Sequence, residues 1–133
     1  MRLQLSRRKG FNLQELSLAT NGLPAVNVAR PGKWGNPFVI YNEEGYPLAI
    51  DSRDGSLLGT NLRWREAYEL VVAKYKAEIT DGLRLEPLRG KNLACWCPEK
   101  LPDGSPCPCH ADVLLDLANP PSPNSLTRRA VDG

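Results

Sequence analysis

The chain has 133 residues and a formal net charge of +2, the size of one domain that can bury its own hydrophobic core. A domain of this size does not need disulfides to fold, so its four cysteines are not required as staples. No charged start followed by an apolar run occurs, and no apolar stretch of about 18 residues. We therefore expect a cytoplasmic protein without a membrane partner, in a compartment that keeps thiols reduced.

Positive charge is concentrated in the first quarter of the chain. Residues 1–33 contain a single acid, Glu15, and six basic residues: Arg2, Arg7, Arg8, Lys9, Arg30 and Lys33. The small net charge argues against a protein whose whole surface binds nucleic acid, whereas the local excess favours a site for an anion. A solvated charged face is the alternative.

The first segments have the patterns of short strands and a short helix. Residues 2–5 and 25–29 alternate in the way that favours strands. Between them, Asn12 can cap a helix through its side-chain oxygen, and Asn21-Gly22 can end that helix in the left-handed conformation. The pattern predicts a strand, a helix and a second strand, in this order.

A β-hairpin is predicted next. Residues 38–40 and 47–50 flank a polar turn in which Gly45 can adopt a positive φ. Residues 51–60 contain two glycines among charged or polar residues and are predicted to form a loop.

The clearest helical pattern lies in the middle of the chain. Apolar and aromatic residues recur at spacings of three and four, and therefore share one face: Trp64, Tyr68, Val71, Tyr75 and Ile79. Thr60 or Asn61 is predicted to cap this helix, and Asp81-Gly82 to end it.

The last elements are a strand over residues 92–97 and a helix over residues 111–118, with Val113, Leu114 and Leu117 packing inward. The Pro-rich segment at 120–133 is predicted to be a disordered tail, so that residues 1–119 form the domain. The order of elements predicts an α/β or α+β fold: a small single sheet with flanking helices, and a cysteine and histidine cluster at a strand end and a helix N-terminus.

All four cysteines and the only histidine lie between Cys95 and His110. In a strand, Cys95 and Cys97 point to the same side and Trp96 points to the other, while Cys109 and His110 come at the start of the following helix. In a reducing compartment, clustered cysteines are more often metal ligands or reactive thiols than disulfides, and zinc takes four nitrogen and sulfur ligands. The predicted zinc ligands are Cys95, Cys97, Cys109 and His110, with Cys107 as an alternative to one of them.

The same residues permit other interpretations. A thiol nucleophile without metal would be Cys97 or Cys109, activated by His110 and oriented by Asp112. If zinc is catalytic, one coordination position stays open for water, and Asp112 is the candidate base. In a third interpretation the cysteines are simply buried and the histidine is packed, since cysteine is among the most buried residue types.

A second candidate site is the glycine- and proline-rich loop at 30–37, which follows a predicted strand. Loops at strand ends commonly carry ligand groups. This loop offers donors for a phosphate, a carboxylate or a base edge, and one stacking face: Arg30, Lys33, Trp34 and Asn36. Alternatively, Trp34 packs over the sheet and Asn36 fixes the turn.

Four segments of the chain together resemble a known family: 4–11, 28–38, 88–97 and 109–115. The pairing of the Trp-Gly-Asn-Pro-Phe and Cys-Trp-Cys motifs is specific, and it resembles the bacterial and phage family catalogued as domain of unknown function 4326, over roughly residues 3–119. The resemblance implies that Cys107 is an extra residue, in an insertion within 99–108, and it implies no activity. It also implies that these residues belong to the family pattern: Cys95, Cys97, Cys109 and His110.

A cysteine and histidine cluster together with a basic loop favours an enzyme or enzyme-like domain that acts on a nucleotide, a nucleoside or a nucleic-acid base. Its partner would be an anionic small molecule or nucleic acid. The alternative is a non-catalytic nucleic-acid-binding module with a closed four-ligand zinc, in which Arg7, Arg8 and Lys9 contact phosphates. In that module Trp34 would stack on a base. A thiol-redox protein ranks last, because a disulfide within Cys95-Trp-Cys97 would be strained.

Overall fold

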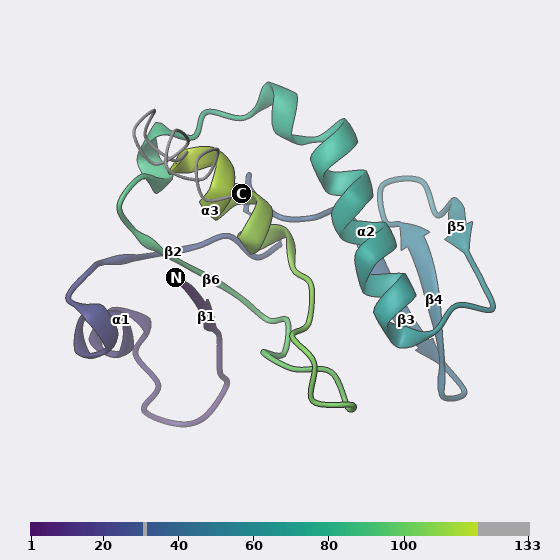
Figure 1. Ribbon diagram of the computed structural model, residues 1–133, viewed down its shortest axis with the longest axis horizontal. Helices are drawn as coiled ribbons and strands as arrows, with labels where there is room; N and C mark the ends of the chain where they lie inside the picture. The colour runs from purple at the N-terminus through teal and green to yellow at the C-terminus, as the bar shows by residue number, and fades with distance from the viewer. Residues whose placement is uncertain (31, 120–133) are drawn as a thin grey trace, which may run out of the picture.

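The computed structural model describes residues 1–30 and 32–119, which form three α-helices, two short 3₁₀ turns and six strands (Figure 1). The predicted α/β class is confirmed. The strands divide into two three-stranded sheets, in place of the single sheet that we expected. After the loop at 30–37, the third, fourth and fifth strands pair only with one another, whereas the last strand returns to pair with the first two. The predicted tail at 120–133 lies outside the described residues.

The first sheet is parallel, and its last strand inserts between the first two. Figure 1 shows a helix on each side of this sheet. All four residues of the central strand are buried: Leu93 and Cys95 belong to the main core, whereas Asn92 and Ala94 face the helix after the first strand. In the order β1-β6-β2, these elements are β1 (Arg2–Gln4), β6 (Asn92–Cys95) and β2 (Ala25–Asn27), with α1 (Leu13–Asn21) and α3 (His110–Ala118).

The second sheet is antiparallel and is covered by the longest helix (Figure 1). The predicted hairpin is confirmed, with Gly45 at φ 91° in its turn. The predicted loop at 51–60 contains a third strand, which the pattern missed because this strand is only three residues long. The elements are β3 (Phe38–Glu43), β4 (Tyr46–Asp51), β5 (Leu57–Gly59) and α2 (Trp64–Glu78).

The helices form where the sequence predicted them. Asn12 caps α1 by accepting a backbone N–H, and Gly22 ends that helix with φ 76°. The predicted face of α2 is the buried one, with Val71 and Tyr75 inside the main core. No helix in the described part of the chain has the length and apolar character needed to cross a bilayer.

Two predicted details of the helices are wrong. Asn61 has φ 54° and does not cap α2, which begins after Arg63, whose backbone N–H donates to the Glu66 carboxylate at 2.9 Å. On α3, Leu117 is 38% exposed, because the buried residues recur at other positions of the helix. Those positions are His110, Ala111, Leu114 and Ala118.

The strand predicted over 92–97 ends earlier, at Cys95. The Cys95 carbonyl accepts the Leu5 N–H at 2.8 Å. Neither neighbouring strand pairs with the chain beyond this point. Cys97 therefore lies on a bend before Pro98, which has no N–H to continue a ladder. Helix α3 begins one residue earlier than predicted, at His110.

The loop at 30–37 is held by Gly35 and Asn36. A Cβ on Gly35 would lie 2.8 Å from the Arg30 Cα, so the loop folds back closely and requires glycine there. The buried Asn36 amide donates to the Val71 carbonyl at 3.1 Å and accepts the Phe38 N–H at 2.9 Å. Asn36 thus ties the loop to α2 and fixes the start of β3.

We expect Asn36→Ala to lower the free energy of unfolding by about 2–4 kcal/mol, because two buried backbone groups lose their partners. Urea unfolding followed by circular dichroism measures this change. Arg30→Ala, an exposed side chain of the same loop, is the control and should change stability by less than about 0.5 kcal/mol. Equal effects of the two substitutions would contradict the structural role of Asn36.

Candidate metal centre and the adjoining cavity

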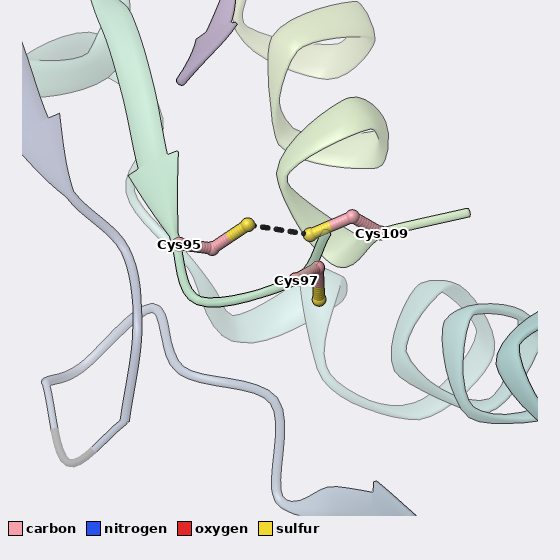
Figure 2. A group of neighbouring side chains, drawn as sticks. All are labelled: Cys95, Cys97 and Cys109. Carbon is pink, nitrogen blue, oxygen red and sulfur yellow. Dashed lines mark hydrogen bonds between the residues drawn. The ribbon is translucent and has the colours of Figure 1, made fainter. Parts of the chain in front are cut away.

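Three cysteine sulfurs form a compact group where β6 ends and α3 begins. The Sγ atoms of Cys95, Cys97 and Cys109 all lie within 4.8 Å of one another, and those of Cys95 and Cys109 are 2.9 Å apart. Figure 2 shows the Cys95 and Cys109 sulfurs directed at each other, with Cys97 beside them on the segment that leaves β6. The structure therefore brings together three of the four predicted metal ligands.

Each sulfur is positioned by a different piece of local structure. Cys95 is the last residue of a buried strand, and Cys97 follows on the bend before Pro98. Cys109 is the N-cap of α3, where its Sγ accepts the Ala111 N–H at 3.4 Å. Because the N-terminus of a helix carries partial positive charge, it stabilises negative charge on this sulfur.

The closeness of the three thiols favours a single thiolate. The hydrogen bond with Cys109 and the neighbouring Cys97 thiol lower the pKa of Cys95, and the nearby Arg2 cation adds to this effect. The contacts with Cys109 and Cys95, together with burial, raise the pKa of Cys97 above its ordinary value. Further negative charge in this buried group therefore requires a cation, which is what a metal ion supplies.

The Arg2 side chain is hydrogen-bonded to the segment between Cys97 and Cys109. Its Nη1 donates to the Cys107 carbonyl at 2.8 Å and to the Asp112 carboxylate at 3.1 Å. Its Nη2 donates at 3.4 Å to the carbonyls of both Pro98 and Glu99. The side chain is only 13% exposed. From the sequence, Arg2 was expected to be one of the basic residues of the first quarter, although its place in the predicted strand at 2–5 was a signal of an inward role.

His110 lies beside the sulfurs with one ring nitrogen fixed. Its Nε2 is 2.8 Å from the Val28 carbonyl, which only accepts hydrogen bonds, so Nε2 carries a proton. Its Nδ1 is 3.7 Å from the Cys109 Sγ, and the ring packs edge to face on Tyr75 with centroids 5.0 Å apart. His110 is buried but is not in the group whose ligand atoms all lie within 4.8 Å of one another.

Cys107 and Asp112 lie outside this group. The Cys107 thiol donates to the Pro108 carbonyl at 3.5 Å, and burial raises the pKa of Cys107 to about 11, so it stays protonated. The Asp112 side chain is 51% exposed and forms an ion pair with Arg2. Burial of its carboxyl raises the pKa of Asp112, and Arg2 partly offsets this rise. Neither residue lines the cavity described next.

A cavity of about 280 Å³ opens beside the three sulfurs. Arg30 lines it together with the cysteine group, so the predicted loop and the predicted cluster meet at one place. Tyr68 of α2 also lines it, and burial raises the pKa of Tyr68 to about 12, which keeps its hydroxyl protonated as a donor. Among the described residues that line the cavity, none is Asp or Glu, and Arg30 is the one Arg or Lys.

Other residues of the predicted loop are engaged elsewhere. The Trp34 Nε1 donates to the Arg84 carbonyl at 3.4 Å, and the Lys33 Nζ lies 4.4 Å from the centroid of the Trp34 ring. Neither Lys33 nor Trp34 lines the cavity. Asn36 does line it, but its amide is bonded to the backbone of α2 and β3.

Of the basic residues at 7–9, Arg7 lies against a residue that lines the cavity. The Arg7 guanidinium is 4.7 Å from the centroid of the Trp96 ring, and Trp96 lines the cavity. Arg8 is exposed, and its backbone N–H donates to the Ser6 hydroxyl at 3.0 Å. Trp96 and Tyr68 were missed as site residues: Trp96 was expected to point away from its cysteine neighbours, and Tyr68 was taken only as part of an apolar helix face.

Comparison with known proteins gives one match. Residues 12–120 match the model of a family described as Domain of unknown function (DUF4326). No curated protein and no solved structure matches the chain. Because the match covers most of the sequence, including the cysteine group and the loop at 30–37, the chain belongs to this family of unknown function, as the resemblance implied.

Proposed function

We propose that this protein binds a zinc ion through Cys95, Cys97 and Cys109 and uses the adjoining cavity to bind and process a nucleotide, a nucleoside or a nucleic-acid base. The observation that carries the proposal is the meeting of three close sulfurs and Arg30 in one cavity. The ion would form part of the cavity wall. Arg30 would hold the anionic or electron-rich part of the ligand.

Zinc is the metal that this donor set favours. Thiolates are soft ligands, and zinc binds them at about 2.3 Å, so that two sulfurs on one tetrahedral ion lie about 3.8 Å apart. The three sulfurs lie within 4.8 Å of one another, and the closest pair, Cys95 and Cys109, is 2.9 Å apart. Only small side-chain rotations would be needed to hold an ion, because the backbone already places the three sulfurs together.

Three protein ligands leave one position of a tetrahedral ion open, which is the arrangement of catalytic zinc sites. When bound, such an ion supplies activation of a water molecule. His110 would contribute its unprotonated Nδ1 as a proton acceptor, held in this tautomer by the Val28 carbonyl. The Tyr68 hydroxyl would donate to the ligand within the cavity.

The size and lining of the cavity support a nucleobase or nucleoside. Its volume of about 280 Å³ lies just below the range of roughly 300–1,000 Å³ that drug-sized ligands occupy, so it suits a small ring system better than a large cofactor. Apolar and aromatic side chains supply faces for a flat ring, and Arg30 supplies a planar set of donors.

One observation favours a second candidate function, in which the zinc site is closed. The Nδ1 of His110 is 3.7 Å from the Cys109 Sγ, close to the separation of about 3.5 Å expected for a nitrogen and a sulfur on one tetrahedral zinc. With His110 as fourth ligand the site would be closed, and the protein would be a zinc-stabilised nucleic-acid-binding module without catalysis. The first candidate is favoured because His110 is outside the group of mutually close ligand atoms.

We expect protein purified without chelator to contain one zinc ion per chain by elemental analysis. Cys97→Ser should lose the metal, and it is the variant of choice because Cys97 is the least buried of the three. Cys107→Ser is the matched control and should keep the metal, because this buried cysteine lies outside the group. Wild-type protein that is folded and free of metal would refute the zinc site.

Replacement by cobalt separates the open site from the closed one. For the open site, we expect the visible spectrum of the cobalt form to show three thiolates, with d–d bands that shift when azide is added and that His110→Ala leaves in place. For the closed site, azide should have no effect, and His110→Ala should change the bands and weaken cobalt binding. The spectrum is read before any activity is known, so the result does not depend on the substrate.

We also expect Arg30→Ala to weaken binding of nucleoside monophosphates by about ten- to 150-fold, the range for lost hydrogen bonds to a charged group. Isothermal titration calorimetry measures this change. Lys33→Ala is the matched control and should bind as wild type, since its ammonium lies over Trp34, outside the cavity. A wild-type affinity in Arg30→Ala would remove the anion-binding role of this residue.

A further inference from the structure

We propose that the ligand reaches the cavity as part of a single-stranded nucleic acid, with one base stacked on Trp96 and the phosphates bound along the basic turn. The basic turn is defined here as Arg7, Arg8 and Lys9. The inference rests on the proposed function and deepens it, because it names the substrate class and assigns a stacking residue at the mouth of the cavity.

Trp96 has the position and exposure of a stacking residue. It lines the cavity, yet 45% of its surface is exposed, although tryptophan is usually well buried. It lies between Cys95 and Cys97, so a base stacked on its indole would be next to the proposed zinc ion. Base stacking on an exposed aromatic ring is a general means of binding unpaired nucleotides.

Arg7 holds the indole in place. Its guanidinium lies 4.7 Å from the centroid of the Trp96 ring, a distance typical of a cation stacked on an aromatic face. Because this contact orders the ring before any ligand binds, less conformational entropy is lost on binding. The same guanidinium places positive charge at the edge of the stacking surface, where a phosphate would lie.

The basic turn is ordered, and its charge is available. Gly10 has φ 83°, the Arg8 N–H donates to the Ser6 hydroxyl at 3.0 Å, and the Phe11 N–H donates to the Arg8 carbonyl at 3.0 Å. All three cations of the turn are exposed. Within residues 1–30 and 32–119, none of them is in an ion pair. A row of exposed cations matches the repeating charge of a phosphate backbone.

These observations favour a single strand over a mononucleotide or a duplex. A mononucleotide has one phosphate group, which Arg30 in the cavity could already bind, and it would leave the basic turn unused. In a duplex, the base faces are stacked on one another and are not available to Trp96. Trp34, the residue that the sequence suggested for stacking, lies outside the cavity, and its indole N–H donates to the Arg84 carbonyl.

The test measures fluorescence anisotropy of labelled mixed-sequence oligonucleotides of about 12 nucleotides, single-stranded DNA and RNA, between about 50 and 200 mM salt. Contacts with two or three phosphates predict a slope of log affinity against log salt of about −1.4 to −2.1. Arg8→Ala and Lys9→Ala should each reduce the steepness by about 0.7. Both side chains are exposed, so circular dichroism should show folded variants.

Substitutions of Trp96 test the stacking separately. Trp96→Ala should weaken binding by roughly five- to 150-fold at every salt concentration and leave the slope unchanged, because stacking involves no phosphate. Trp96→Phe should retain most of the affinity but lose the quenching of tryptophan fluorescence on binding. Trp34→Phe is the matched control, and it should retain both affinity and quenching.

Three results would overturn the inference. They are no binding of either oligonucleotide, equal affinity for duplex and single strand, and competition by a mononucleotide at the same concentration as the oligonucleotide. Failure of this inference is distinguishable from failure of the proposed function. A chain that binds mononucleotides through Arg30 but gains nothing from a longer strand keeps the proposed function and loses only the single-strand interpretation.

Discussion

The cysteine group depends on the hydrogen bonds that Arg2 makes to the backbone between Cys97 and Cys109. One guanidinium, mostly buried, binds three carbonyls of this segment and the Asp112 carboxylate at its far side. Hydrogen bonds from a charged donor are worth more than neutral ones, about 1.5–3 kcal/mol each. Together with the backbone bond from the Cys107 N–H to the Glu99 carbonyl at 3.0 Å, these bonds hold the segment that returns the chain to the start of α3, with Cys109 facing Cys95.

The same cation has an electrostatic role. It lies close enough to Cys95 to lower the pKa of that thiol, and thus offsets the cost of a buried negative charge. Buried cysteines alone would be an ordinary feature of a core, and Cys95 and Cys109 do belong to the main hydrophobic core. Three sulfurs within reach of one ion, beside a fixed histidine and a buried arginine, go beyond what packing requires.

The sequence was sufficient where structure is decided locally. The cap at Asn12, the hairpin turn at Gly45 and the buried face of α2 each follow from a few neighbouring residues, and each is found. It was insufficient where distant segments meet. Division into two sheets depends on pairing between remote strands, and the role of Arg2 depends on a segment about 100 residues later in the chain.

The candidate site shows the same limit. The cysteine group could be predicted because the residue type and clustering carry the signal, whereas the register that places Cys97 beyond the strand could not. Asn36 and Trp34 were candidate ligand residues because of their chemical groups, with the alternative that Trp34 packs over the sheet and Asn36 fixes the turn. In the structure, the Asn36 amide is hydrogen-bonded to the backbone of α2 and β3, and the Trp34 indole is hydrogen-bonded to the Arg84 carbonyl. Folding brings α2 and Arg84 close to this loop.

The division into two sheets has a mechanical consequence. The two sheets share no ladder of backbone hydrogen bonds, yet the cavity draws its walls from both halves, with Cys95 on one side and Val39 and Ile40 on the other. A molecule bound there would link the two sheets, because it would contact both at once. Its binding free energy would add to the stability of the whole fold. The two sheets should therefore separate transiently more often in the empty protein than in the ligand-bound one.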